Sequence, residues 1–245
     1  MISPILWKEW REQRWKLAFG TLMLVFFTGS FLAARVTSDR EVAVVIWVAG
    51  GLILALHSAM GVFAPERANG TMNFLASKPV EPWKVFACKW LFGWLNVAGP
   101  MLACTLVLIL FRPGDTTMMG LGAQRVIRGA IGGLGLATMF YTMTCCLAPR
   151  RAGEAAVGLV GLLVFVALML HMVVAGSMVM EPVYRDNVEP SLLGKVLLFV
   201  NPLTWIAFVK PFHPKFGSPI MMILVQIVLF VLVVWIGLRK WQRSV

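Results

Sequence analysis

Residues 65–90, PERANGTMNFLASKPVEPWKVFACKW, separate two long apolar runs with charges, prolines and a turn. Pro65 predicts the end of a helix arriving from residue 42, because proline lacks an amide donor and clashes with the preceding turn. Asn69-Gly70 is typical of a tight turn. We therefore expect the chain to leave the apolar region here and to return with a new helix, which Pro82 can begin without losing a hydrogen bond.

A short helix is predicted inside this interruption. The Thr71 hydroxyl can cap it by accepting a hydrogen bond from an otherwise unpaired amide. Pro79 ends it at about Lys78, since the residue before a proline avoids the helical region. A capped helix of two turns with charges around it suits a protein that docks from outside the membrane. An ordinary loop at the membrane surface is the alternative, and the local signals leave both open.

The composition is that of a membrane protein. Of the 245 residues, 59% are hydrophobic and 13% are charged, against about 25% charged in an average soluble domain. About 20 helical residues cross the hydrocarbon, and helices are favoured there because they pair their own backbone groups. We therefore expect one all-α integral membrane domain over residues 1–245. Its six transmembrane helices are predicted at residues 17–34, 42–64, 91–111, 129–148, 155–180 and 219–238.

Basic residues predict the orientation. The formal net charge is +11, and most Lys and Arg residues flank the ends of the predicted spans that share a side with both termini. The positive-inside rule then places both termini in the cytoplasm. Residues 1–16 interleave Trp7, Trp10 and Trp15 with basic side chains, which predicts an interfacial helix in contact with lipid head groups. A plain positive flank of the first span is the alternative. We expect membrane lipid, and not nucleic acid, as the partner of this charge.

Residues 190–216 are apolar enough to be mistaken for a seventh span. Counting them would put the basic C-terminus on the outer side, against the charge bias. Asn201-Pro202 also interrupts the run in its middle. We expect a re-entrant element that dips into the membrane from outside, which requires protein or water to satisfy its backbone.

Both of these regions resemble the ATP-binding cassette type-2 permease family. The segment between the second and third spans of that family is similar to residues 65–83 here, and it leads into a span that bears a lysine, here Lys89. The run Asn201-Pro202-Leu203-Thr204 resembles a motif often found before the last span. The matching residues of the coupling segment are Glu66, Arg67, Gly70, Thr71, Phe74, Leu75, Pro79 and Val80. Asn69 and Asn73 stand where many members carry a further acidic residue.

The resemblance implies a function and partners. In that family the short helix is a coupling helix that docks on a separate ATPase subunit, which binds ATP and Mg. The chain itself would bind no cofactor, would pair with itself or with a similar permease, and would export an unidentified substrate across the cell membrane. Asn201, Pro202 and Thr204 would belong to an outer lid. Asn96, Thr138, Tyr141 and Thr142 could line a substrate path, although hydroxyls also bond harmlessly to their own helix.

Other classes of function lack their motifs. The six predicted spans contain no Asp, Glu, Lys or Arg in their interiors, whereas ion-coupled carriers usually bury ionisable groups there. Neither HExxH, GxSxG nor GxxxxGK[ST] occurs, so we expect no enzyme activity of the chain's own. His57 and His171 could bind a ligand, but hydrogen-bonded structural roles are favoured, and no metal site is expected. A membrane anchor that recruits a partner stays open as an alternative, and an intramembrane enzyme is a further one.

Overall fold

The computed structural model describes residues 3–34, 49–68, 81–110, 119–148, 153–180, 189–204 and 219–242. These residues are almost entirely helical, without a strand among them. The helices are α1 (Ser3–Ala34), α3 (Gly51–Ala68), α5 (Pro82–Leu110), α6 (Met119–Leu147), α7 (Glu154–Ala175) with the π-helix η3 (Gly176–Met180), α9 (Leu192–Val200) and α10 (Pro219–Gln242).

Four of the helices in the described ranges are long and apolar enough to cross a membrane. They cover residues Trp83–Leu110, Val126–Leu147, Glu154–Val179 and Ile220–Lys240, while the apolar part of α3, Gly51–Val62, is shorter. The chain is therefore a multi-pass helical membrane protein. The count of six spans stays a prediction. α1, which contains the first predicted span, is not among these four helices, and part of the second predicted span lies outside the described residues.

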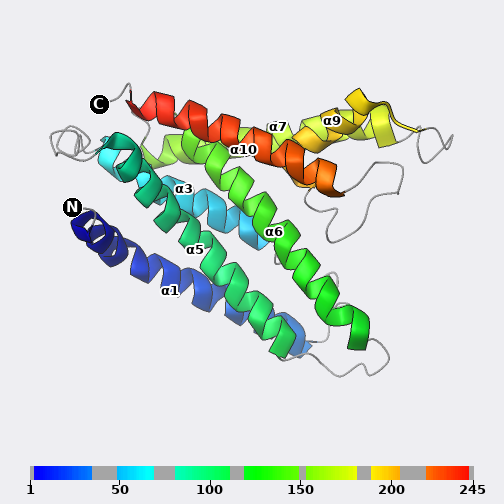
Figure 1. The fold of residues 1–245 in the computed structure, drawn as a ribbon. Coiled ribbons are helices and arrows are strands. Elements are labelled where there is room, and N and C mark those ends of the chain that lie inside the picture. The colour runs from blue at the N-terminus through cyan, green and yellow to red at the C-terminus, as the bar shows by residue number, and fades with distance from the viewer. Residues whose placement is uncertain are drawn as a thin grey trace.

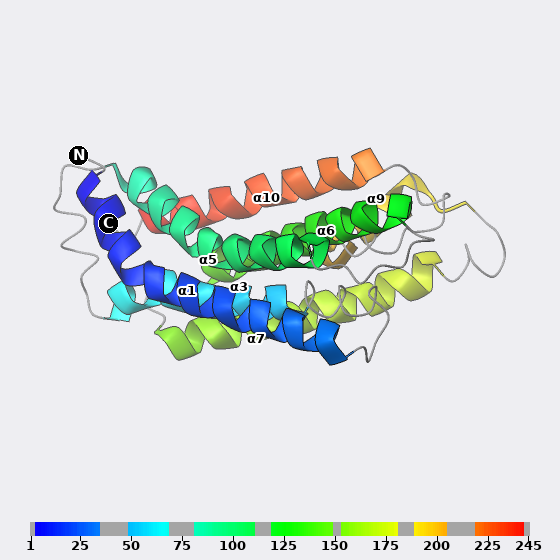
Figure 2. The ribbon, with the colours of Figure 1, turned by 90° about the horizontal axis from the view of Figure 1, so that it is seen from below.

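The helices pack side by side along their long axes. The N-terminus and the C-terminus lie at the same end of the bundle (Figures 1 and 2). α1 and α5 run parallel: Glu9 contacts Lys89 near the start of both helices, and Thr28 contacts Cys104 further along both. α5 packs against α1, α3, α6 and α10, so it is the element that most of the bundle shares. We call the end that holds both termini the terminal end.

Basic side chains concentrate at the terminal end. Those that the structure describes there are Lys8, Arg11, Arg14, Lys16, Lys84, Lys89, Arg239 and Lys240, whereas Arg128 and Lys195 lie toward the opposite end. The spatial arrangement thus gathers charges that the sequence distributes over three separate segments, in α1, α5 and α10.

Three predicted boundaries differ from the structure. α3 continues through Pro65 to Ala68, because a proline removes one hydrogen bond but does not by itself end a helix that continues with good helix formers. α6 begins at Met119, ten residues before the predicted span, since a helix can project beyond the apolar layer with charged residues on it. The predicted interfacial helix 1–16 is continuous with the first span in α1, although Figure 2 shows the first turns of α1 at an angle to the rest.

Other boundaries agree with prediction. α5 restarts at Pro82 and runs without a break through Pro100, whose ring packs near Gly20 of α1. α7 and η3 together cover the predicted fifth span. α9 ends before Asn201, so the predicted interruption of the 190–216 element is confirmed. Residues 205–216 of that element lie outside the described residues.

Gly93 of α5 lies in close contact with α3 and α6. The Ser58 hydroxyl of α3 donates to the Gly93 carbonyl oxygen at 2.6 Å. A Cβ at position 93 would clash with Tyr141 Oη and with a methyl carbon of Val62. These contacts leave no room for any other side chain unless one of the neighbouring helices moves.

We expect Gly93→Ala to destabilise the bundle by about 1–3 kcal/mol through overpacking. Unfolding by sodium dodecyl sulfate in mixed micelles, followed by circular dichroism, measures the change. Gly29→Ala is the matched control, because a Cβ there meets nothing within 4 Å and alanine favours the helix. Equal unfolding midpoints for the two variants would contradict the packing described here.

Candidate functional site

A buried polar seam joins α1 to α5. Lys89 Nζ of α5 donates to Glu9 Oε1 of α1 at 2.5 Å, and each side chain is only 2% exposed. One turn further along α1, Gln13 Oε1 accepts a hydrogen bond from Asn96 Nδ2 at 2.8 Å. Glu9 and Gln13 are four residues apart and therefore share one face of their helix. We call these four residues the α1–α5 seam.

The seam fixes the position of α1 relative to α5. A charge buried away from water is tolerated only with a partner of opposite sign and good geometry. The Glu9–Lys89 pair therefore sets the axial position of α1 relative to α5. The hydrogen bond between Gln13 and Asn96 fixes the same axial position at a second point, further along both helices. Because the two helices are parallel, a displacement at the start of α5 acts on the start of α1 at the same level.

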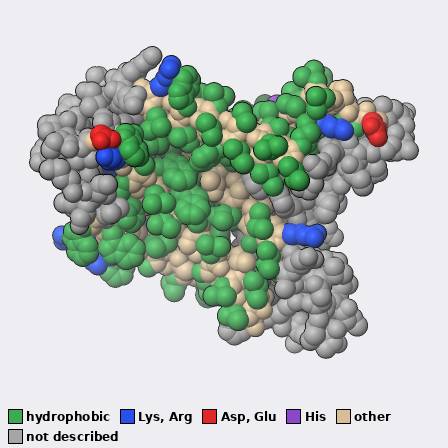
Figure 3. Space-filling model, in the orientation of Figure 1, with side chains coloured by type: hydrophobic (Ala, Val, Ile, Leu, Met, Phe, Trp, Pro, Cys, Tyr) green, Lys and Arg blue, Asp and Glu red, His purple; other side chains and the backbone are tan. Residues whose placement is uncertain are grey.

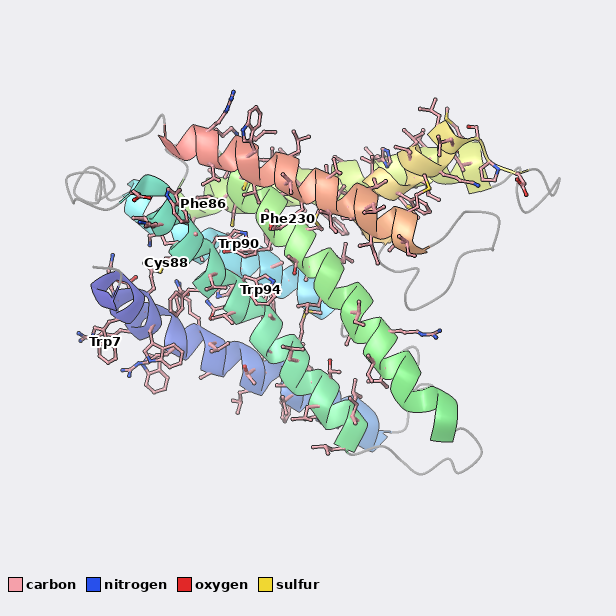
Figure 4. All side chains as sticks on the ribbon, in the orientation of Figure 1. Trp7, Phe86, Cys88, Trp90, Trp94 and Phe230 are labelled. Carbon is pink, nitrogen blue, oxygen red and sulfur yellow. The ribbon has the colours of Figure 1, made fainter. Side chains whose placement is uncertain are left out.

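A ladder of tryptophan and threonine joins α5 to α6. Trp90 Nε1 donates to Thr142 Oγ1 at 3.2 Å, and Trp94 Nε1 donates to Thr138 Oγ1 at 2.9 Å. The two indole rings stack with their planes 10° apart, and Figure 4 shows them between the two helices. The Tyr141 hydroxyl donates to the Trp90 carbonyl oxygen at 3.1 Å.

These contacts place all four residues that the sequence suggested for a substrate path. Thr138, Tyr141 and Thr142 lie together against α5, whereas Asn96 belongs to the α1–α5 seam on another face of that helix. Each has a hydrogen-bond partner inside the bundle. A role of these residues in lining a substrate path stays a prediction. In the structure, their hydrogen bonds connect neighbouring helices.

Asn201 joins three helices at the end opposite the termini. Its Nδ2 donates to the Leu168 carbonyl oxygen of α7 at 2.7 Å and lies 3.1 Å from His171 Nδ1, also of α7. Its Oδ1 accepts from the Leu203 amide at 2.9 Å. Gln226 Nε2 of α10 donates to the Asn201 carbonyl oxygen at 3.2 Å. The end of α9 is thereby attached to α7 and α10.

The remaining predicted lid residues complete this turn. Pro202 begins a 3₁₀ turn with Leu203 and Thr204, and the Thr204 hydroxyl donates to the Asn201 carbonyl oxygen at 2.7 Å. His171 therefore has the hydrogen-bonded surroundings that a structural role predicts. Among the described residues, no group of three His, Cys, Asp or Glu side chains could hold a metal ion.

The predicted coupling segment is described only at its two edges. Glu66 and Arg67 lie in the last turn of α3, whereas Gly70, Thr71, Phe74, Leu75, Pro79 and Val80 lie outside the described residues. At the other edge, the Glu81 carboxylate accepts from Lys84 Nζ at 2.8 Å and from Trp83 Nε1. The hydrogen bond from Lys84, followed by that from Trp83, holds the pKa of Glu81 below its ordinary value. Both edges lie at the terminal end (Figure 1).

The sequence interpretation missed the pairing of Glu9 with Lys89. The hydropathy pattern places both residues in the cytoplasmic flanks, because it assigns charged side chains to water and contains no information on which of them pair. The four-residue spacing of Glu9 and Gln13 is a signal that one polar face of α1 could be buried. Its partners on α5 are set by tertiary packing, and no local pattern identifies them.

Comparisons with known protein families, with curated proteins and with solved structures find no match for the chain. Function is therefore argued from the residues of the chain itself.

Proposed function

We propose that the chain is the membrane-spanning permease subunit of an ATP-binding cassette exporter. It works as a dimer, either of itself or with a similar permease, together with separate ATPase subunits that bind ATP and Mg. The substrate is not specified by any residue in the chain. Both termini and residues 65–83 face the cytoplasm in this proposal, which agrees with the basic side chains at the terminal end.

The position of residues 65–83 in the chain, between α3 and α5, supports the proposal. This segment has the residues that resemble a coupling helix, and it connects the end of α3 to the start of α5. α5 is the helix shared by most of the bundle, and its first turns are attached to α1 by the buried pair Glu9–Lys89. A force on the segment would therefore act on α3, α5 and α1 together.

A transport cycle follows from this connection. ATP binding closes the two ATPase subunits and displaces the predicted helix 71–78. α3 and α5 tilt in response, α1 follows α5 through the seam, and a path opens outward between the protomers. The turn at Asn201, Pro202 and Thr204 is the outer lid, and its attachment to α7 and α10 ties the lid to helices that border the path.

Leu75→Glu tests the coupling role. We expect the ATP turnover of the co-purified complex to fall by about thirtyfold, because the substitution puts a charge at the centre of an apolar contact, where single side chains contribute about 2 kcal/mol or more to binding. The complex is purified through a tag on this chain, and phosphate release is measured at saturating ATP.

Ser77→Glu is the matched control, since it adds the same charge on the opposite side of the predicted helix. It should leave turnover close to that of the unmodified complex, and both variants should insert into the membrane normally. Turnover that is unchanged in Leu75→Glu, or reduced equally in both variants, would count against a docking face that contains Leu75.

A further inference from the structure

Three tryptophans at the terminal end each carry a cation on the indole ring. The guanidinium carbon of Arg14 lies 5.6 Å from the ring centroid of Trp15, Lys84 Nζ lies 5.6 Å from that of Trp83, and the guanidinium carbon of Arg239 lies 3.8 Å from that of Trp235. The pairs come from α1, α5 and α10. We call them the tryptophan–cation ring.

All three indoles face outward from the bundle. Trp15 is 72% exposed, Trp83 is 49% exposed and Trp235 is 48% exposed. Exposed tryptophan is typical of the membrane–water boundary, where the ring sits at the level of the head groups. The three pairs lie on three helices that are separated by tens of residues in the sequence.

Two acids near the ring pair with cations outside it: Glu9 contacts Lys89, and Glu12 lies 3.8 Å from Lys8. Glu81, by contrast, pairs with Lys84 of the ring itself, so Arg14 and Arg239 are the cations that carry the argument. Glu154 lies in the first turn of α7, where a negative charge complements the helix end. Within the described ranges, Arg14 and Arg239 have no carboxylate partner.

The opposite end differs. Its described basic side chains, Arg128 and Lys195, have no aromatic ring beneath them in the part of the chain that the structure describes. Figure 3 shows hydrophobic side chains over much of the described surface between the basic groups at the two ends. One boundary of the apolar surface is therefore lined with stacked cations, and the other is not.

We propose that the tryptophan–cation ring binds the phosphate head groups of anionic phospholipids in the leaflet on the side of the termini. A guanidinium that lies flat on an indole keeps its N–H edge free, and that edge matches two phosphate oxygens. Each basic residue near an anionic membrane surface strengthens attraction to it. The ring would select anionic over zwitterionic lipid, whether or not the chain is a permease.

Native mass spectrometry of the purified full chain tests this proposal. The chain, in a neutral detergent, is mixed with equal amounts of phosphatidylglycerol and phosphatidylcholine that have identical acyl chains. We expect bound phosphatidylglycerol to predominate. In the double variant Arg14→Gln and Arg239→Gln, the relative binding constant for phosphatidylglycerol should fall by about twenty-five-fold, or about fivefold for each arginine removed.

The control variant carries Arg128→Gln and Lys195→Gln, which remove the same charge at the opposite end. It should keep the preference of the unmodified chain, and circular dichroism verifies that both double variants are folded. Equal binding of the two lipids, or an equal loss in both variants, would overturn the proposal. Displacement of phosphatidylglycerol by an equal concentration of inorganic phosphate would also overturn it. So would a mass spectrum in which an acidic protein, and no lipid, is bound to the purified chain.

Discussion

Replacing Lys89 with methionine is expected to destabilise the bundle by about 3–5 kcal/mol, because the buried Glu9 carboxylate would lose the ammonium group that it contacts. The two side chains are both 2% exposed, with 2.5 Å between Lys89 Nζ and Glu9 Oε1, so water cannot replace the lost cation. Methionine preserves the length of the side chain and adds no clash. The change in unfolding free energy is measured by titration with sodium dodecyl sulfate in mixed micelles.

Two further variants separate the charge from the packing. Glu9→Gln combined with Lys89→Met should recover most of the loss, since the buried carboxylate is then removed together with the ammonium group. Lys84→Met should change stability little, because its partner Glu81 is exposed and surface ion pairs contribute little. A loss in Lys89→Met no larger than that in Lys84→Met would mean that the seam does not hold α1 to α5.

Asn201→Leu is expected to destabilise the protein by about 2–4 kcal/mol. The substitution keeps an apolar side chain of similar size but removes the hydrogen bonds to the Leu168 carbonyl, to His171 and from the Leu203 amide. Interhelical hydrogen bonds in membranes contribute about 0.6–2 kcal/mol each, and a buried donor left unpaired adds its own cost. The same detergent titration measures the effect.

Ser191→Ala gives the comparison at the other end of α9. Ser191 caps that helix by accepting from the Gly194 amide at 3.1 Å, at an exposed position, so its loss should cost only about 1 kcal/mol. If the two variants unfold at the same detergent fraction, Asn201 does not attach α9 to α7 and α10.

The helical membrane fold could be predicted because its signal is averaged over many residues. About 20 apolar residues in sequence predict a span whatever the order of the side chains, and α5, α7 and α10 lie close to their predicted ranges. The break after α9 was predictable for a different reason: the chemistry of Asn201-Pro202 is local. By contrast, Pro65 locally predicts the end of a helix, but α3 continues past it to Ala68.

The pairing of residues could not be predicted in the same way. The sequence places Lys89 just before the third predicted span, but Glu9 lies eighty residues away from it. Only the parallel packing of α1 and α5 brings the two together. Likewise, Thr138 and Thr142 were candidates for a substrate path because hydroxyls in spans are conspicuous, and only the structure shows that Trp94 and Trp90 donate to them.

Isolation of the complex tests the central claim most directly. The tagged chain is purified from a mild detergent, the co-purifying polypeptides are labelled with a photoreactive ATP analogue, and the labelled band is sequenced. The account predicts a stoichiometric partner that carries GxxxxGK[ST], binds the analogue and hydrolyses ATP. A chain that purifies alone, or with partners that bind no ATP, would contradict the assignment as a permease subunit.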